Sequence, residues 1–198
     1  MSKSAVIKMA YENNGIVTSS MVSEANLSRN YLSQLVKDNK LEKVSRGVYT
    51  LPEAWEDEFL NAQVSYKRGI FSLGTALYLH GFTDRTPMQL QFTFPEGYNT
   101  SAPIRSGFRC NKVKKDVFEL GVEEVTSPSG NLVRAYNIER TLCDIVKVTN
   151  RVEIQVITDA FKQYMSSKSK NIPLLSFYAK ILKVDKRIRT LFRGIAMK

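Results

Sequence analysis

The residue types that most often carry catalysis are scarce in this chain. His80 is its one histidine, and its two cysteines are Cys110 and Cys143. A structural zinc site needs four Cys or His ligands, so these three residues cannot supply one. A catalytic triad or a Cys–His dyad could be built on His80 alone, and we expect a structural role for it at a helix C-terminus. We interpret the cysteines as small, reduced hydrophobic residues rather than as a disulfide.

The acidic residues form no convincing catalytic pair either. Asp84 and Glu96 lie around a predicted strand, as nuclease carboxylates do, but no lysine accompanies them in the right pattern. Glu139 and Asp144 point about 140° apart around a predicted helix, which favours ion pairs with Arg140 over general acid–base work. The phosphate-binding patterns GxxxxGK[ST] and GxGxxG are absent from the sequence. We therefore expect no catalytic residue, no metal, no cofactor and no enzymatic activity.

The charge of the chain points instead to a polyanionic partner. Its 198 residues include 29 Lys and Arg against 19 Asp and Glu, a net charge of +10, with a pI near 9.6. Residues 1–52 carry a net charge of +3, residues 53–149 of −1 and residues 150–198 of +8. If both ends face one ligand, they form a long basic surface; otherwise the charge aids solubility.

The ends of the chain and its apolar runs bear on where the protein works. Met1 is followed by Ser-Lys-Ser, without the apolar run of a secretory signal. No apolar run approaches the 18 or so residues of a membrane-spanning helix. We therefore expect a cytoplasmic protein that makes no membrane contact.

Three short helices and a hairpin are predicted in the first 52 residues. The expected helices cover residues 4–13, 19–25 and 28–39, and the expected strands cover residues 41–44 and 48–51. In the first two helices we expect Val6, Met9, Ala10, Met21, Val22 and Ala25 to point inward. Asn14-Gly15 ends the first helix, and Thr18 or Ser19 caps the second.

The third of these helices has two contrasting faces. Leu32, Leu35 and Val36 form an apolar stripe, while the opposite face carries hydrogen-bonding and basic side chains and no acid. Helix, helix, turn, helix and hairpin is the order of a winged helix-turn-helix, which places its third helix in the major groove and its hairpin on the backbone or minor groove. The predicted DNA-binding residues of this segment are Ser28, Arg29, Asn30, Tyr31, Ser33, Gln34, Lys37, Lys43 and Arg46. A small helical bundle with a polar surface is the alternative.

The remaining residues predict an α+β fold: a connecting helix or linker over residues 53–70 and a mixed domain over residues 71–198. We expect Trp55, Phe59 and Leu60 on a helix at residues 53–60. A half-buried strand is predicted at residues 89–94, because apolar and polar residues alternate there. The other predicted elements are a helix at 72–80, strands at 108–113 and 132–136, a turn at 127–131, and helices at 152–165 and from Pro173 onward. Residues 138–148 are predicted to form an amphipathic helix with Leu142, Ile145 and Val146 inside. The expected sheet is short and antiparallel.

Two further groups of cations could contact a phosphate backbone. Lys112, Lys114 and Lys115 lie at the end of a predicted strand, and Lys186, Arg189 and Arg193 share one face of the last helix, with Arg187 beside them. A solvated basic face is the alternative for both groups.

Four segments stand out as a set: SRGVYTLP at 45–52, FSLGTALYLHGFTDRTP at 71–87, LQFTFPEG at 90–97 and RAYNIERTLCDIVK at 134–147. In this order they resemble AbiEi, the antitoxin family of the bacterial AbiE abortive-infection systems, and in particular its streptococcal members. The resemblance implies a winged helix that binds inverted repeats in its own promoter and represses transcription. It also implies that residues 71–198 neutralise a nucleotidyltransferase-like toxin, AbiEii, in a type IV system that confers phage resistance without a stable toxin–antitoxin complex.

Two other readings of the sequence stay open. Residues 53–198 could form an enzyme that modifies the toxin or a nucleic acid, or they could hold a ligand pocket of a metabolite-sensing winged-helix repressor.

Overall fold

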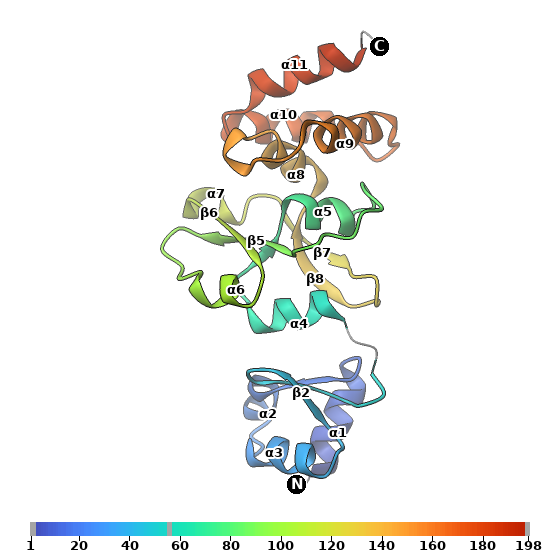
Figure 1. The fold of residues 1–198 in the computed structure, drawn as a ribbon, viewed down its shortest axis with the longest axis vertical. Coiled ribbons are helices and arrows are strands. Elements are labelled where there is room, and N and C mark those ends of the chain that lie inside the picture. Colours follow the sequence, from blue (N-terminus) through green and yellow to red (C-terminus); the bar gives the residue numbers. More distant parts are fainter. Residues whose placement is uncertain (1–2, 55–56, 197–198) are drawn as a thin grey trace. The chain divides into compact units, whose positions relative to one another are not determined.

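A computed structural model of the chain describes residues 3–54 and 57–196. The fold is α+β, and it divides into two compact units (Figure 1). The first unit comprises Met1–Lys67 and Thr126–Val133, and the second comprises Arg68–Val125 and Arg134–Lys198. The division into a DNA-binding domain that ends at residue 52 and an antitoxin domain that begins at residue 71 stays a prediction. Within the described ranges, no helix combines the length and the apolar character needed to cross a membrane.

Three helices and a small sheet make up residues 3–50 of the first unit. The elements are α1 (Lys3–Glu12), β1 (Ile16–Thr18), α2 (Ser19–Glu24), α3 (Asn30–Lys37), β2 (Glu42–Ser45) and β3 (Val48–Thr50). Val6, Val22, Leu32 and Leu35 meet in their core. Ala25 is exposed rather than buried as predicted, since α2 ends at Glu24 and Ala25 is only its C-cap.

The sheet of this unit contains one strand more than the predicted hairpin. Its order is β1-β3-β2, and β1 pairs antiparallel with β3, so that Ile16 faces Thr50. Thr18 ends β1 and caps α2, because its side chain accepts a hydrogen bond from the Met21 amide at 3.1 Å. The hairpin is thereby joined to the start of α2.

The helix expected at residues 53–60 begins later in the chain. α4 runs from Glu58 to Ser65, and Asp57 caps it by accepting hydrogen bonds from the amides of Phe59 and Leu60. The other carboxylate oxygen of Asp57, which is 2% exposed, accepts from the Ser127 hydroxyl at 2.5 Å. This buried cap fixes the start of α4, and the predicted position of Trp55 lies outside the described residues.

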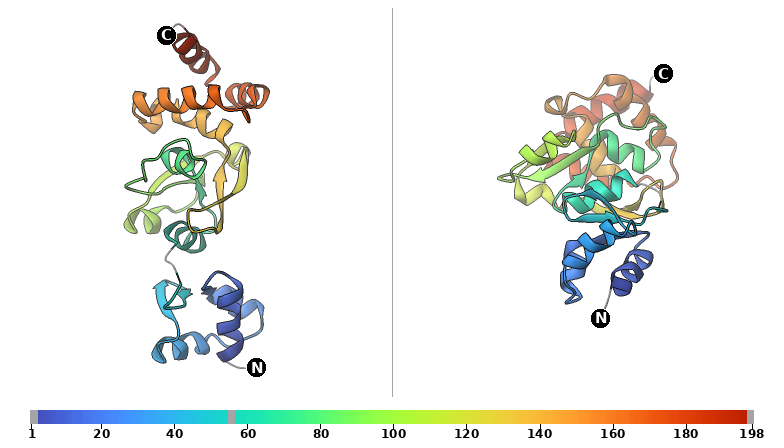
Figure 2. Two further views of the ribbon diagram at one scale, coloured as in Figure 1. Left: turned by 90° about the vertical axis from the view of Figure 1, so that its right-hand side faces the viewer. Right: turned by 60° about the horizontal axis from the view of Figure 1, so that its bottom comes forward.

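The second unit is a five-stranded sheet covered by helices. Its elements are β4 (Ile70–Phe71), α5 (Leu73–Leu79), β5 (Gln91–Pro95), α6 (Ser101–Arg105), β6 (Arg109–Val113), α7 (Lys115–Phe118), β7 (Val122–Thr126), β8 (Leu132–Tyr136), α8 (Ile138–Ile145), a 3-10 turn (Val148–Asn150), α9 (Ile154–Ser166), α10 (Ile172–Ile181) and α11 (Asp185–Ala196). In both Figure 1 and Figure 2, α9, α10 and α11 lie beyond α8 on the side away from the sheet.

The sheet is mixed rather than antiparallel, which corrects the prediction. Its order is β6-β5-β4-β8-β7; β5 pairs parallel with β6, β4 parallel with β8, and β4 antiparallel with β5. β5 therefore has neighbours on both edges and helices near both faces. This explains why Phe92, Thr93 and Phe94 are all buried, although the alternation predicted a half-buried strand.

The two faces of this sheet differ in chemistry. On one face, Phe71 stacks on Phe92 with ring centroids 4.4 Å apart, and Phe108 packs edge-on against Phe92. On the other face, the buried Thr93 hydroxyl donates to the buried Ser72 hydroxyl at 2.9 Å. The sheet thus combines an aromatic face with a face that is partly polar.

Candidate nucleic-acid interface

α3 separates apolar and polar side chains as the sequence predicted. Leu32 and Leu35 are each 1% exposed, and Val36 is half-buried. On the outer side Asn30, Ser33, Gln34 and Lys37 are all exposed, while Tyr31 is half-buried against the core of the unit. These outer side chains include amide groups, which can read base edges, and an ammonium group, which can pair with phosphate.

The N-terminal end of α3 is held by Ser28 and Arg29. The Ser28 hydroxyl accepts a hydrogen bond from the Asn30 amide at 3.3 Å, but the N-cap of α3 is Arg29, whose side chain makes no capping hydrogen bond. α3 itself begins at Asn30, two residues later than predicted, and Asn39 follows its end in the left-handed conformation. Arg29 is exposed, and its Nε donates to the Ser23 hydroxyl of α2 at 2.6 Å. That bond orients the guanidinium beside the outer face of α3.

The hairpin presents two exposed cations. Lys43 lies on β2, and Arg46 lies in the turn before Gly47. Gly47 has a φ of +78°, which a residue with a side chain rarely adopts, and its carbonyl accepts from the Ser19 amide at 2.9 Å. The turn that carries Arg46 is therefore fixed against the start of α2.

An acid close to α3 is neutralised by a neighbour. Asp38 follows the last residue of α3, and its Oδ2 lies 2.8 Å from Nζ of Lys3 on α1. The hydrogen bond with Lys3 is the main cause that lowers the pKa of Asp38. The anion at this end of α3 is paired, so its repulsion of a phosphate is reduced.

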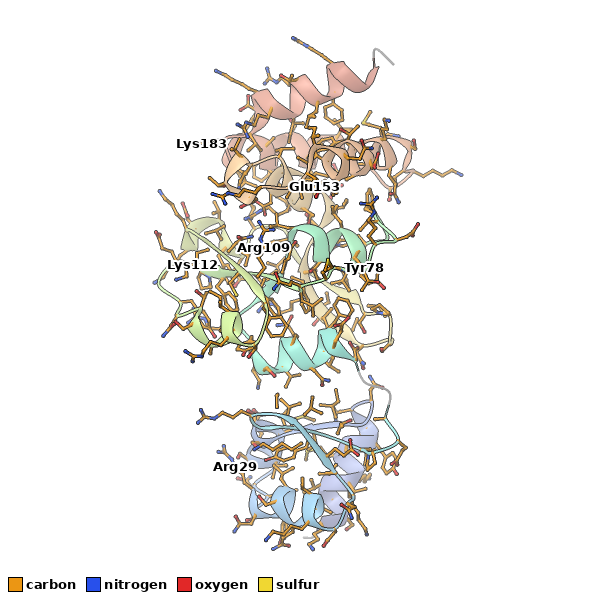
Figure 3. The ribbon with its side chains drawn as sticks, in the orientation of Figure 1. Arg29, Tyr78, Arg109, Lys112, Glu153 and Lys183 are labelled. Atoms are coloured by element: carbon orange, nitrogen blue, oxygen red, sulfur yellow. The ribbon has the colours of Figure 1, made fainter. Side chains whose placement is uncertain are left out.

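The cations predicted in the second unit are all exposed. Lys112 lies on β6, Lys114 precedes α7, and Lys115 begins α7, next to the exposed Asp116. Figure 3 labels Lys112 and also Lys183, a cation between α10 and α11 that is not among the predicted DNA-binding residues. Lys183 is exposed and has a φ of +58° at the end of α10.

Two of the four predicted cations of α11 are engaged within the unit. Arg187 donates from Nη1 to the Val146 carbonyl at the end of α8, at 2.8 Å. Arg189 lies 3.5 Å from Asp185, one turn earlier in the same helix. Lys186 and Arg193 are exposed on α11 as well. The Arg187 contact suits a helix C-terminus, where a cation meets free carbonyls.

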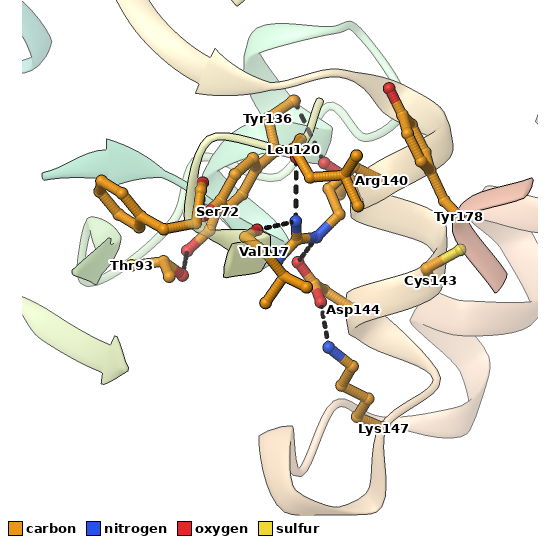
Figure 4. Close-up of polar contacts among 12 residues, drawn as sticks. Ser72, Thr93, Val117, Leu120, Tyr136, Arg140, Cys143, Asp144, Lys147 and Tyr178 are labelled. Atoms are coloured by element: carbon orange, nitrogen blue, oxygen red, sulfur yellow. Dashed lines mark hydrogen bonds and ion pairs between the residues drawn. The ribbon is translucent and has the colours of Figure 1, made fainter. Parts of the chain in front are cut away.

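The structure confirms the predicted ion pair of Arg140 with Asp144 (Figure 4), but Glu139 takes no part in it. Arg140 is 0% exposed and donates from Nε to Asp144 at 2.8 Å. Its Nη1 donates to the carbonyls of Val117 and Leu120. Lys147, which the prediction left out, pairs with the other oxygen of Asp144 at 2.7 Å. Asp144 is therefore surrounded by cations and has no place in an acid–base pair with Glu139.

Glu139 belongs to a different network on α8. It is 5% exposed, and its Oε1 accepts from the Tyr164 hydroxyl at 2.9 Å and from the Asn171 amide at 3.2 Å. Burial and this hydrogen bond together raise the pKa of Tyr164. The carboxylate thus joins α8 to the end of α9 and the start of α10. α8 is buried on every side from Glu139 to Ile145, whereas an amphipathic helix was predicted.

The histidine and the two cysteines contact other parts of the fold and form no cluster of reactive groups among the described residues. His80 caps the C-terminus of α5, and its Nε2 lies 2.9 Å from the Tyr136 carbonyl and 3.6 Å from Glu123. Both cysteines are free thiols, and burial raises the pKa of the Cys143 thiol to about 12. In the part of the chain that the structure describes, no three His, Cys, Asp or Glu side chains come together as a metal site.

Comparison with solved structures supports the fold. The chain is similar to the RV2827C protein from Mycobacterium tuberculosis, with a TM-score of 0.54 and 14% identity, over 98% of this chain and 80% of that one. Among curated proteins, none matches the chain. The family model described as "Transcriptional regulator, AbiEi antitoxin" matches residues 8–52, the segment that holds α3 and the hairpin. This match supports a relationship between the chain and the AbiEi family of transcriptional regulators and antitoxins.

Proposed function

We propose that this protein is a sequence-specific DNA-binding repressor and antitoxin without enzymatic activity of its own. In this proposal the first unit is a winged helix-turn-helix: α3 enters the major groove, and the β2–β3 hairpin contacts the backbone or minor groove. The observation that carries it is the exposed polar face of α3, with Asn30, Ser33, Gln34 and Lys37 outside and Leu32 and Leu35 in the core. The family match over residues 8–52 supports the regulatory role.

The proposed ligand is the promoter of the protein's own operon. In this proposal the protein is cytoplasmic and recognises inverted repeats in that promoter. Asn30 and Gln34 would contact base edges, while Arg29, Lys37, Lys43 and Arg46 would contact phosphates. The cations of the second unit at Lys112, Lys114, Lys115 and on α11 would add phosphate contacts. The family match supports the antitoxin role, and we propose that the second unit neutralises a nucleotidyltransferase-like toxin of a type IV abortive-infection system, without a stable complex.

Binding of sequence variants by two substituted proteins tests the DNA-reading role. Gln34→Ala should change which operator bases are preferred, because it removes an amide that can bond to a base edge. Arg46→Ala should weaken binding to all sequences by a similar factor. Lys8→Ala is the matched control, since Lys8 is exposed on α1, outside α3 and the hairpin. Equal effects of Gln34→Ala and Arg46→Ala on every sequence would contradict the proposed placement of α3.

A further inference from the structure

Strands β5 and β6 of the second unit carry a row of polar side chains on one face, a position that apolar side chains usually occupy in a sheet covered by helices. Gln91 and Arg109 face each other across the parallel β5–β6 pair, and Thr93 faces Asn111 two residues further along. Alternate residues of a strand share a face, so all four lie on the same side of the sheet. The opposite side carries the aromatic stack of Phe71 and Phe92.

One atom of this polar row lacks a partner. The Nδ2 of Asn111 is buried and has no hydrogen-bond partner among the residues that the structure describes. A buried donor without a partner costs roughly 1–3 kcal/mol, so such groups are uncommon unless a role retains them. The row therefore contains an unused hydrogen-bonding group two residues from Arg109, although Asn111 itself does not line the cavity described next.

A cavity of about 360 Å³ opens along the same side of the sheet. Its polar lining includes Arg85, Gln89, Gln91, Arg109 and Glu153 as well as two threonines, and its apolar lining includes Leu77, Met88 and Val156. All of these residues belong to the second unit. The size and the mixture of apolar walls with a few polar groups are those of small-molecule sites.

Several of the lining groups are fixed in position before any ligand arrives. The Oε1 of Gln91 accepts from the Gly74 amide at 2.7 Å, and the Gln91 amide donates to the Thr75 hydroxyl at 2.8 Å. Arg109 donates from one Nη to the Asn150 carbonyl at 2.7 Å, which leaves its other donors for the cavity.

The backbone next to the cavity is strained. Leu73 is 1% exposed and has a φ of +52°, in the left-handed region that a leucine rarely adopts. It immediately precedes Gly74, which lines the cavity; a Cβ at Gly74 would lie 3.1 Å from Oε1 of Gln91. Strained residues that persist in a folded chain cluster at ligand sites.

The lining restricts the class of ligand. Two guanidinium groups, Arg85 and Arg109, favour a phosphate; Arg85 is exposed and Arg109 is half-buried. The amide of Gln89 and the carboxylate of Glu153 can bond to the edges of a nitrogen-containing ring or to sugar hydroxyls. Met88 is fully exposed and offers a flexible apolar group at the cavity's mouth for the flat face of such a ring. These groups together suit a nucleotide better than a bare anion.

We propose that this cavity binds a nucleoside phosphate, with Arg109 and Arg85 on the phosphates and with Gln89, Glu153 and Met88 on the nucleoside. This gives the second unit a ligand-binding role that goes beyond the proposed DNA binding. The two can fail separately, because the cavity lies wholly in the second unit and the base-reading residues lie in the first.

Titration calorimetry of the full chain with ATP, GTP, CTP and UTP tests the proposal. We expect at least one nucleotide to bind with one-to-one stoichiometry, and at least tenfold more tightly than inorganic pyrophosphate. Arg109→Gln should weaken binding about tenfold or more, because a charge-assisted hydrogen bond is lost, and Arg85→Gln should weaken it as well. Arg105→Gln is the matched control, since Arg105 is exposed on α6 and lines no part of this cavity.

Further variants separate the cavity from general attraction to a basic protein. Arg46→Ala should leave nucleotide binding unchanged, whereas Met88→Ala should weaken nucleotides and leave pyrophosphate unaffected. If Arg109→Gln lowers the melting temperature strongly, the exposed Arg85 and Met88 decide the outcome. The proposal is overturned if no nucleotide binds saturably, if pyrophosphate binds as tightly as the nucleotides, or if Arg105→Gln weakens binding as much as Arg85→Gln.

Discussion

Arg140 and Asp144 form an ion pair inside a single buried helix. The Nε of Arg140 donates to Oδ2 of Asp144 at 2.8 Å, and the two side chains are 0% and 5% exposed. The guanidinium also lies 4.3 Å from the centre of the Tyr136 ring, which adds a cation–π contact. All residues of α8 from Glu139 to Ile145 are buried, so this ion pair lies inside the second unit (Figure 4).

Asp144→Ala should lower the free energy of unfolding by about 3–5 kcal/mol, because it leaves the buried Arg140 without its counterion. Urea unfolding measures this change. Asp159→Ala is the control: Asp159 is exposed on α9, and its loss should cost no more than about 0.5 kcal/mol. A loss below about 1 kcal/mol for Asp144→Ala would show that the pair contributes little.

Because Glu139 and Asp144 are buried, they are poor positions at which to test whether residues 53–198 form an enzyme. A loss of toxin protection in an Asp144→Ala or Glu139→Ala protein would report a damaged fold, since both carboxylates are buried and hydrogen-bonded. Asp84 and Glu96 are exposed and can be replaced without this difficulty. We expect Asp84→Ala and Glu96→Ala proteins to protect cells that express the cognate toxin as well as the unchanged protein does. Loss of protection with an unchanged melting temperature would favour the enzyme reading.

Alkaline pH should destabilise the second unit. Burial raises the pKa of Cys143 from 9.0 to about 12, and it also raises the pKa values of Tyr136 and Tyr164 above 10.0. The folded state keeps these groups protonated where the unfolded chain ionises them, so their contribution is complete below about pH 9 and falls as the pH rises toward 12. Unfolding by urea at pH 8 to 11 measures it. Tyr136→Phe should make the decline shallower; an unchanged slope in that variant would be contrary to the burial argument.

The two thiols should differ in reactivity. Cys143 is buried and Cys110 is only half-buried, and burial raises the pKa of both thiols. Because the thiolate is the reactive form, a disulfide reagent at pH 8 should label Cys110 slowly and Cys143 only after unfolding. Counting thiols with and without denaturant measures this. Rapid labelling of both thiols in the folded protein would mean that α8 opens readily.

Repression and protection should be separable within the full chain. Gln34 and Arg46 are exposed in the first unit, so replacing both with alanine should leave the folded structure intact. We expect this double variant to lose repression of a reporter fused to its promoter while it still protects cells from the toxin. Lys8→Ala should keep both activities. Loss of protection in the double variant would show that neutralisation depends on DNA binding.

Local signals in the sequence predicted the first unit well. The apolar spacing of Leu32 and Leu35 and the helix cap at Thr18 each depend on residues only a few positions apart, and both features are found in the structure. The pairing of β1 with β3 was missed because three residues carry too little pattern to specify a distant partner.

The second unit was harder to predict because its determinants lie far apart in the sequence. The alternation of Gln91 to Phe94 indicates a strand but not its two neighbours, so neither the parallel pairing nor the burial of Thr93 could be foreseen. Arg140 was expected to form ion pairs, but its burial could not be foreseen, because it bonds to the carbonyls of Val117 and Leu120, which lie 23 and 20 residues earlier in the chain. The cavity residues Arg85 and Arg109 are 24 residues apart and form no motif.

The salt dependence of promoter binding tests the central claim most directly. If α3, the hairpin and the cations of the second unit all contact one duplex, six or more phosphates are neutralised, and the logarithm of affinity should fall against the logarithm of salt concentration with a slope of about −5 or steeper. Fluorescence anisotropy with the protein's own promoter fragment measures this slope, and Arg46→Ala should reduce it by about 1. A flat dependence, or a promoter fragment that the purified protein does not bind, would contradict the account.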